Sequence, residues 1–192
     1  MFKNGYTIKN FQSKKTFSSF LSGVAGTMGV PIWSFYVNRG QAITSFGSKD
    51  KNGAIMEFFP ANAAYMHTQR LGFRTLVKVD GKFYEFFKVA NEFQTMNITQ
   101  DKLVIEELNN ELNLKLTITY HTLPNEKNGG LIRKVKLENL GKKRHVEVID
   151  GLAQILSAGI DYGGFKAVSN LLQSWMQVDK INNALFYKLR GT

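Results

Sequence analysis

Apolar and polar residues alternate most regularly in the middle of the chain. Over residues 112–122, leucine, isoleucine and tyrosine occupy every second position, with mainly asparagine, lysine and threonine between them. This period of two places the apolar side chains on one face of a strand, as in an antiparallel sheet that covers a core. Residues 131–140 and 145–149 predict two more strands, joined in a hairpin by the basic turn Lys142-Lys143-Arg144.

The clearest hairpin signal lies earlier in the chain. Residues 73–79 and 82–87 are rich in β-branched and aromatic residues, and Asp80-Gly81 stands between them. An Asp-Gly pair favours the positive-φ turn that matches the twist of two paired strands. Residues 93–98 and 103–107 predict two short strands after this hairpin.

The N-terminal part also predicts strands. A meander of three consecutive antiparallel strands is expected at residues 31–37, 42–46 and 54–59. Pro60 ends the third of them, because proline cannot donate to a strand ladder. Short edge strands are expected at residues 6–8 and 16–20. Residues 61–70 show too little pattern for an assignment, and we expect a loop that crosses one mouth of the sheet.

Near the C-terminus the period changes to three and four, which predicts one amphipathic helix or helical turn. Its apolar stripe, expected to face the core, consists of Phe165, Val168, Leu171, Leu172 and Trp175. Residues 184–189 predict a closing strand. About ten strands at short spacing predict an all-β fold, a large antiparallel β-sandwich with one short helical segment near the C-terminus. No repeat or linker interrupts the chain, so we expect one domain over residues 1–192.

Composition limits the function classes. The chain has no cysteine, which excludes a disulfide scaffold and a thiolate metal site. It shows neither a signal-peptide pattern nor an apolar run of about 20 residues, so we expect a cytoplasmic protein with no membrane partner. The formal net charge is +10, but lysines occur singly along nearly every segment. We therefore expect no nucleic-acid partner, and a basic nucleic-acid-binding domain is the less favoured alternative.

No self-contained catalytic set is recognisable. The three histidines are far apart in sequence, and none has the neighbours of a metal site, so no metal and no cofactor are expected. The small residues 22–29 lack the Lys-Ser/Thr of a phosphate loop. Glu106, Glu107 and Glu111 are interpreted as part of a solvated turn, and Asp150 as a residue that either caps the turn at Gly151 or has a functional role.

One aromatic stretch, residues 30–65, combines ring side chains with polar ones. The rings are Trp33, Phe35, Tyr36, Phe46, Phe58, Phe59 and Tyr65, and the polar residues between them are Asn38, Arg39, Gln41, Glu57 and Asn62. Aromatic faces beside amide and guanidinium donors suit a sugar, which has apolar C–H faces and a hydroxyl rim. The alternative is an aromatic β-core with ordinary surface polar residues.

Five residues are candidates for substrate binding. Arg39 and Arg74 could meet a phosphate or carboxylate bidentately, and Gln41, Asn62 and Tyr65 are candidate contacts to sugar hydroxyls. In the alternative interpretation the two arginines brace loops through backbone carbonyls or Glu57. No catalytic residue is assigned.

Several strings of the chain resemble the amino-terminal part of bacterial glycoside phosphorylases of the cellobiose phosphorylase type (glycosyltransferase family 36-like). Together they cover nearly the whole chain. They are Phe20-Leu21-Ser22-Gly23-Val24-Ala25-Gly26, Val30-Pro31-Ile32-Trp33-Ser34-Phe35-Tyr36-Val37-Asn38-Arg39-Gly40-Gln41, Ser45-Phe46-Gly47, Ile55-Met56-Glu57-Phe58-Phe59-Pro60-Ala61-Asn62, Gly72-Phe73-Arg74-Thr75, Asp150-Gly151-Leu152 and Ser174-Trp175-Met176.

The resemblance implies an N-terminal supersandwich of the galactose mutarotase type, in a chain that is a fragment of a longer multidomain protein. Its partners would be an (α/α)₆ catalytic domain of the same protein, which carries the Asp proton donor, an oligosaccharide substrate and, in some members, a second copy in a homodimer. Inorganic phosphate would be the co-substrate. The string Asn38-Arg39-Gly40-Gln41 matches a divergent branch, so a β-glucoside or oligosaccharide other than cellobiose is equally admissible.

Three functions therefore stay open. The chain is an accessory domain of an inverting phosphorylase that forms the cleft rim and an interface but has no activity alone, or a stand-alone carbohydrate-binding module. The third is the nucleic-acid binder, whose affinity would fall steeply with salt.

Overall fold

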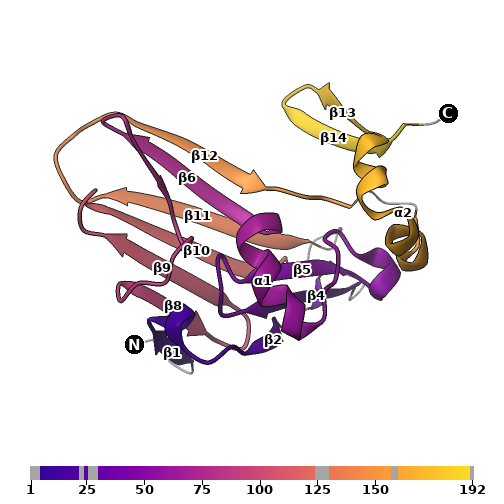
Figure 1. The fold of residues 1–192 in the computed structure, drawn as a ribbon, viewed down its shortest axis with the longest axis horizontal. Helices are drawn as coiled ribbons and strands as arrows, with labels where there is room; N and C mark the ends of the chain where they lie inside the picture. Colours follow the sequence, from indigo (N-terminus) through magenta and orange to yellow (C-terminus); the bar gives the residue numbers. More distant parts are fainter. Residues whose placement is uncertain (1–4, 22–23, 26–29, 124–129, 157–159, 191–192) are drawn as a thin grey trace.

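The structure is a computed structural model that describes residues 5–21, 24–25, 30–123, 130–156 and 160–190. Its strands form several antiparallel sheets, accompanied by two α-helices and short 3₁₀ turns (Figure 1). The predicted all-β, sandwich-like fold is confirmed.

The largest sheet has five antiparallel strands in the order β1-β8-β9-β10-β11. The strands are β1 (Tyr6–Lys9), β8 (Gln94–Ile98), β9 (Leu103–Asn109), β10 (Leu114–Thr122) and β11 (Leu131–Asn139). The 3₁₀ turn η1 (Phe11–Ser13) follows β1. The alternation read from the sequence is confirmed in β10, where Leu114, Leu116, Ile118 and Tyr120 are fully buried.

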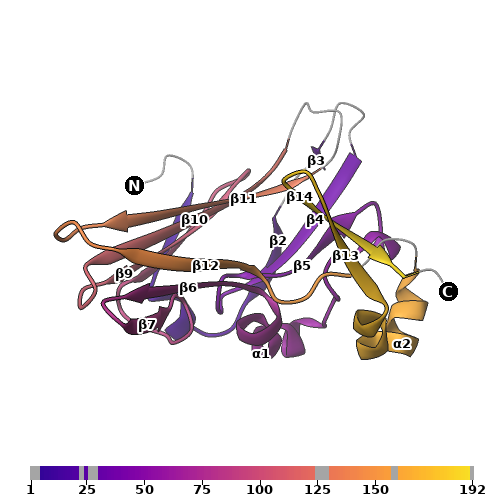
Figure 2. The same ribbon diagram turned by 90° about the horizontal axis from the view of Figure 1, so that it is seen from above.

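A second layer faces this sheet, as the view of Figure 2 shows for β12 and β6 below β11 and β10. It has the order β12-β6-β7, with β12 (Val146–Leu152), β6 (Phe73–Val79) and β7 (Lys82–Glu85). The predicted β6–β7 hairpin is confirmed, and both residues of its turn have positive φ, 51° at Asp80 and 79° at Gly81. A third sheet contains β2 (Ser18–Leu21), β3 (Val24–Ala25), β4 (Val30–Val37) and β5 (Ile43–Ser48).

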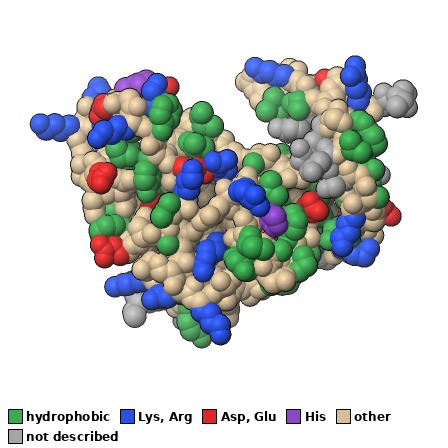
Figure 3. All heavy atoms as spheres, viewed as in Figure 1, with side chains coloured by type: hydrophobic (Ala, Val, Ile, Leu, Met, Phe, Trp, Pro, Cys, Tyr) green, Lys and Arg blue, Asp and Glu red, His purple; other side chains and the backbone are tan. Residues whose placement is uncertain are grey.

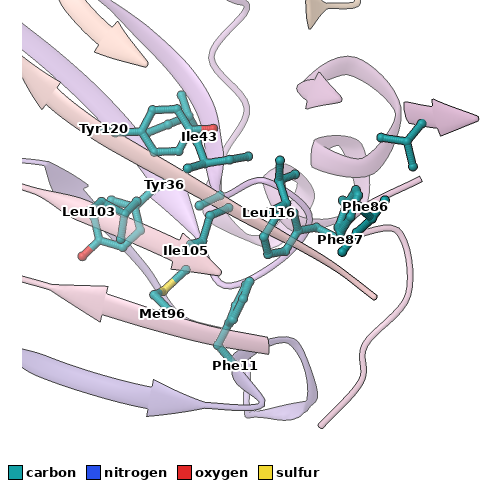
Figure 4. Packing of buried hydrophobic residues seen from close by; sticks show 14 of the residues in the cluster. Phe11, Tyr36, Ile43, Phe86, Phe87, Met96, Leu103, Ile105, Leu116 and Tyr120 are labelled. Atoms are coloured by element: carbon teal, nitrogen blue, oxygen red, sulfur yellow. The ribbon is translucent and has the colours of Figure 1, made fainter. Parts of the chain in front are cut away.

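The main hydrophobic core lies between these layers. Rings and aliphatic side chains from distant segments meet there, among them Phe11, Phe86, Phe87, Met96 and Tyr120 (Figure 4). All five are at most 2% exposed. Burial of this apolar surface is the main stabilising contribution to the fold.

One buried residue departs from the prediction. Glu107 was expected in a solvated turn, but it lies on β9 and its side chain is fully buried. Its carboxylate accepts hydrogen bonds from the Tyr84 hydroxyl, from the backbone N–H of Phe87 at 2.5 Å and from the amides of Gln94 at 2.9 Å and Asn91 at 3.2 Å. Burial raises its pKa, against the effect of these donors. The residue therefore organises the loop between β7 and β8.

The N-terminal meander is only partly correct. Strands β4 and β5 pair as expected, but residues 54–59 form no strand beyond a single bridge between Gly47 and Ala54. The 3₁₀ turn η2 (Lys51–Gly53) leads into this extended segment. The predicted loop 61–70 is instead helix α1 (Ala61–Leu71). Alanine, glutamine and methionine are good helix formers, and the few buried positions, Ala64 and Thr68, left a weak sequence signal.

Helix α2 (Tyr162–Ser174) confirms the predicted C-terminal helix, but its stripe is narrower than expected. Phe165 and Leu172 are buried, whereas Leu171 is 63% and Trp175 47% exposed. The predicted closing strand, β14 (Ala184–Leu189), pairs with a strand that the pattern had not indicated, β13 (Met176–Ile181).

The basic turn after β11 is not a hairpin, because β11 pairs with β10 and β12 pairs with β6. The chain changes sheets there. The two sheets are joined again by Arg133 of β11 and Asp150 of β12. Arg133 donates from Nη1 to Asp150 Oδ2 at 2.6 Å and from Nη2 to Asp150 Oδ1 at 2.8 Å. Asp150 therefore belongs to a strand and an inter-sheet ion pair, and does not cap a turn at Gly151.

This ion pair is the centre of a polar network. Arg133 Nη2 also donates to Gln41 Oε1 at 2.6 Å, and the Thr75 hydroxyl donates to Asp150 at 2.5 Å. The guanidinium lies 4.7 Å from the centre of the Phe73 ring, and the Arg133 side chain is only 9% exposed. Arg133 therefore depends on Asp150 for charge compensation in a largely buried place.

We expect the substitution Asp150→Asn to lower the free energy of unfolding by about 2 kcal/mol, because Arg133 would stay buried without its counter-charge. Burial raises the Asp150 pKa, but the hydrogen bonds from Arg133 and Thr75 outweigh it, so the pKa lies below 3.8. The stabilisation is thus complete above pH 3.8 and is lost as the pH falls through the folded-state pKa.

Urea unfolding as a function of pH measures this effect. The control is Glu147→Gln, on the same strand as Asp150, which breaks an exposed 3.0 Å ion pair with Lys78 of β6. It should change the unfolding free energy by about 0.5 kcal/mol or less. Equal losses in the two variants would contradict a special role of the inter-sheet pair.

Candidate functional site

A pocket of about 330 Å³ opens where the third sheet meets helix α2, and we call it the aromatic pocket. Its lining comes from five separate parts of the chain: Phe20, Trp33, Asp50 with Lys51, Phe58 and Tyr162. Figure 1 shows α2 beside the end of the sheet that contains β4 and β5. A volume of this size lies within the range of about 300–1,000 Å³ that small-molecule sites occupy.

Three rings of the pocket, Phe20, Trp33 and Phe58, belong to one aromatic row with Phe35. Trp33 and Phe58 meet edge to face, with centroids 6.1 Å apart, and Phe58 lies 5.2 Å from Phe35. Phe35 in turn lies 5.1 Å from Phe20, which is 53% exposed. The row thus runs from the partly buried Trp33 through the buried Phe35 to the exposed Phe20, and the pocket offers aromatic surface to a ligand.

Hydrogen bonds fix the wall residues. The Trp33 indole donates from Nε1 to the Asp50 carbonyl at 3.2 Å, and the Tyr162 hydroxyl donates to the Phe58 carbonyl at 3.0 Å. The backbone N–H of Tyr162 donates to Asn52 Oδ1 at 3.1 Å. Because each of these bonds joins two separate segments, the ring positions are set before any ligand arrives.

Two lysines flank the Tyr162 ring. Lys51 Nζ lies 5.8 Å from the ring centre, and Lys166 Nζ lies 4.9 Å from it. Lys51 and Asp50 also line the pocket, so its rim carries charged hydrogen-bonding groups beside an apolar interior. Such a combination can hold a molecule that has both an apolar face and hydroxyl groups.

The local sequence of β4 explains why Trp33 reaches the pocket. Successive residues of a strand point to opposite faces, so Tyr36 packs into the main core while Trp33, Phe35 and Val37 face the other side. Trp33 pairs with Gly47 of β5. A Cβ atom at Gly47 would lie 2.8 Å from Trp33 Cζ2, so only glycine leaves room for the indole there.

The aromatic stretch of the sequence therefore divides into three groups. Trp33 and Phe58 line the pocket. Tyr36 and Phe46 belong to the main core. The rest, Phe35, Phe59 and Tyr65, form a smaller cluster with Val37 and Ala64. Most rings of the stretch fill the interior, as the alternative interpretation expects, and two line the pocket, so sugar binding by this stretch stays a prediction.

The structure does not bring the five candidate binding residues together. Arg39 donates to the carbonyls of Asn38 at 2.7 Å and Lys14 at 3.1 Å, so it braces the loop after η1. Gln41 is 2% exposed and bonds to Thr75 and Arg133 in the inter-sheet network.

Arg74 forms a bidentate pair with Glu85, at 2.6 and 2.9 Å, and not with Glu57. Arg74 and Gln41 line one crevice, but its volume is only about 10 Å³, enough for about one water molecule. Asn62 is exposed at the start of α1, and Tyr65 packs on the small aromatic cluster.

Phe20 and Tyr162 are pocket residues that the sequence had not indicated. Phe20 lay in a predicted edge strand, and Tyr162 stood next to the apolar stripe of the predicted helix. No spacing links positions 20, 33 and 162, so only the tertiary structure brings these rings together. Part of the small-residue stretch 22–29 lies outside the described residues.

Other site types find little support in the described part of the chain. It contains no group of three or more His, Asp or Glu residues that could hold a metal ion. His67 stacks on Phe59, with ring centres 4.3 Å apart. No helix among the described residues is long and apolar enough to cross a membrane. On the face seen in Figure 3, lysine and arginine side chains are spread among acidic and apolar ones.

Comparisons with known proteins give no family for this chain. No family model matches the sequence, and no curated protein matches it.

The close contact at Gly47 generates a prediction. Gly47→Ala should destabilise the protein by about 2 kcal/mol, because the new methyl group would overlap with Trp33 and with the backbone of Gly53 and Ala54. The Trp33 fluorescence should change with it, which is measured in a Trp175→Phe background that leaves Trp33 as the sole tryptophan.

Gly151→Ala is the matched control, since a Cβ atom there would meet nothing within 4 Å. It should leave the unfolding free energy within about 0.5 kcal/mol of the parent. If both alanines have the same effect, the packing of Trp33 against Gly47 does not constrain the pocket.

Proposed function

We propose that this chain recognises a carbohydrate at the aromatic pocket and serves as the β-sandwich of a larger sugar-processing protein of the glycoside phosphorylase type. The observation that carries the proposal is the pocket itself, about 330 Å³ in volume and lined by the rings of Phe20, Trp33, Phe58 and Tyr162.

The aromatic walls of the pocket suit the apolar face of a sugar ring. Aromatic faces pack on the C–H face of a pyranose, and the rim groups Asp50 and Lys51 offer an acceptor and a donor for its hydroxyls. The walls are fixed by hydrogen bonds between segments, so little conformational entropy is lost on binding.

The role in a larger protein follows from the sequence resemblance. In this proposal the (α/α)₆ domain performs inverting phosphorolysis of a β-glucoside or oligosaccharide with inorganic phosphate, and this sandwich forms the rim of its cleft and an interface. Near the pocket, Asp50 Oδ1 accepts from the Asn52 N–H at 2.9 Å and Asp161 Oδ1 from the Gly164 N–H at 2.7 Å. Both carboxylates thus accept from backbone N–H groups at the start of η2 and α2. This local structural role supports a pocket that binds a ligand and does not catalyse a reaction.

A stand-alone carbohydrate-binding module is the second candidate. The exposure of Phe20, 53%, favours it, because a ring open to solvent can hold a sugar without a second domain. The two candidates share the pocket and differ in whether a catalytic domain accompanies it.

Sugar binding can be tested on the chain in a Trp175→Phe background. Titration with cellotetraose should change the Trp33 fluorescence in a saturable manner. Phe20→Ala should weaken binding about tenfold without unfolding the protein, because this ring is half exposed. Trp33→Ala removes the fluorophore, so its binding is measured by isothermal titration calorimetry, and we expect this variant to abolish binding.

The matched control is Phe83→Ala, which removes a ring that is 74% exposed but lies outside the pocket. Tyr36→Ala is unsuitable as a binding test, because Tyr36 is 4% exposed in the main core and its loss should unfold the protein. Equal affinity in the parent and in Phe20→Ala, or no saturable response to gluco-oligosaccharides, would refute the pocket as a sugar site.

The accessory role generates a separate prediction. The chain alone, mixed with cellobiose or another β-glucoside and inorganic phosphate, should release no glucose and no sugar phosphate. A coupled assay for glucose measures this outcome. Phosphorolysis by the purified chain that disappears with an inactivating substitution in it would contradict the proposed division of labour.

A further inference from the structure

A second hollow lies along β1, which is an edge strand of the large sheet. It has a volume of about 980 Å³, and we call it the β1 groove. Its lining residues are Gly5, Tyr6, Thr7, Ile8, Lys9, Lys14, Thr95, Asn97 and Glu106. Five of them are consecutive, so the groove follows the edge of the strand. Thr95, Asn97 and Glu106 extend it over β8 and β9, and Lys14 follows the turn η1.

The groove contains polar groups that are partly fixed. The Thr7 hydroxyl donates to Asn97 Oδ1 at 2.7 Å, and Asn97 is only 4% exposed. Among the described residues, Asn97 Nδ2 has no hydrogen-bond partner, and this nitrogen is not among the fully buried polar atoms. A largely buried amide thus keeps a donor open to the groove.

The charges of the groove are not balanced. Glu106 is compensated by Lys115, whose Nζ lies 2.6 Å from its carboxylate. Lys9 and Lys14 are exposed and form no ion pair with the described residues. Lys14 is held in place, because its carbonyl accepts from Arg39 Nη2 at 3.1 Å and Asn38 Nδ2 at 3.4 Å. The groove therefore presents two ammonium groups that could pair with an anionic ligand.

An aromatic ring stands at the same place. Tyr6 lines the groove and is 79% exposed, far more than a ring that serves the core. An exposed ring beside hydroxyl and amide groups is the surface on which a sugar ring stacks, and lysines add affinity for carboxylate, sulfate or phosphate substituents.

We propose that the β1 groove binds an anionic oligosaccharide, with a sugar ring on Tyr6, hydroxyls on Asn97 and the threonines, and acidic substituents on Lys9 and Lys14. This site is separate from the aromatic pocket and does not depend on the function proposed for it. The groove is large enough for more than one sugar unit, whereas the pocket has a third of its volume.

The test compares trigalacturonate with the neutral cellotriose by isothermal titration calorimetry. It uses a Trp33→Ala background, in which we expect no binding at the aromatic pocket. We expect trigalacturonate to bind and cellotriose to bind at least about tenfold more weakly. The double variant Lys9→Gln/Lys14→Gln should lower the affinity for trigalacturonate about tenfold, and Tyr6→Ala should lower it several-fold.

Two controls separate a built site from general attraction. Lys82→Gln/Lys142→Gln removes the same charge from exposed lysines outside the groove and should change the affinity less than about twofold. Phe83→Ala is the control for Tyr6→Ala. The proposal is overturned by no binding of trigalacturonate, by equal losses in both lysine double variants, or by equal affinity for a triglutamate peptide. Failure of cellotetraose to bind the parent protein would instead concern the aromatic pocket.

Discussion

Strand β4 is packed on both faces, and the rest of the structure depends on this constraint. One face contributes Tyr36 to the main core, and the other places Trp33, Phe35 and Val37 against the helices and the extended segment. A strand buried on both faces must be nearly continuously apolar, as Val30–Val37 is. Because β4 must be apolar on both faces, it also places the Trp33 ring in the wall of the aromatic pocket.

Polar contacts complete what apolar packing begins. The edge strand β11 of the large sheet lies near the edge strand β12 of the second sheet. Hydrogen bonds among Arg133, Asp150, Thr75 and Gln41 join the two sheets there. These residues come from strands β6, β11 and β12 and from the turn between β4 and β5. Such a network is stable only when all its members are present, so it specifies how the sheets align as well as holding them together.

The sequence predicted most of the strands because their patterns are local. The alternation in β10 and the Asp80-Gly81 turn are decided by neighbouring residues, and the structure agrees with both. Helix α1 was not predicted, because only Ala64 and Thr68 are buried and two positions do not show a helical period. Glu107 looked like a turn residue because a buried carboxylate is recognisable only from its four donors, which lie between positions 84 and 94.

The candidate site was predictable only in its central part. The rings of Trp33 and Phe58 lie in the stretch that the sequence singled out, whereas Phe20 and Tyr162 join them through tertiary contacts. Arg39 and Arg74 show a second reason why the sequence did not predict the site. A guanidinium that could bind a ligand and one that pairs with Glu85 or a loop carbonyl look the same in sequence, since the difference is in partners that folding supplies.

The buried carboxyl group of Glu107 gives the protein an unusual response to acid. Its pKa is raised above 4.5 by burial, so the folded state holds a proton that the unfolded chain releases, and stability falls as the pH rises through this interval. Asp150 acts in the opposite sense, because its pKa is lowered below 3.8. The two contributions are complete together only between pH 3.8 and 4.5. A rise in pH above this interval therefore keeps the inter-sheet pair intact, while the contribution of Glu107, whose carboxylate holds the loop that carries Phe87, is lost as the pH passes through its folded-state pKa.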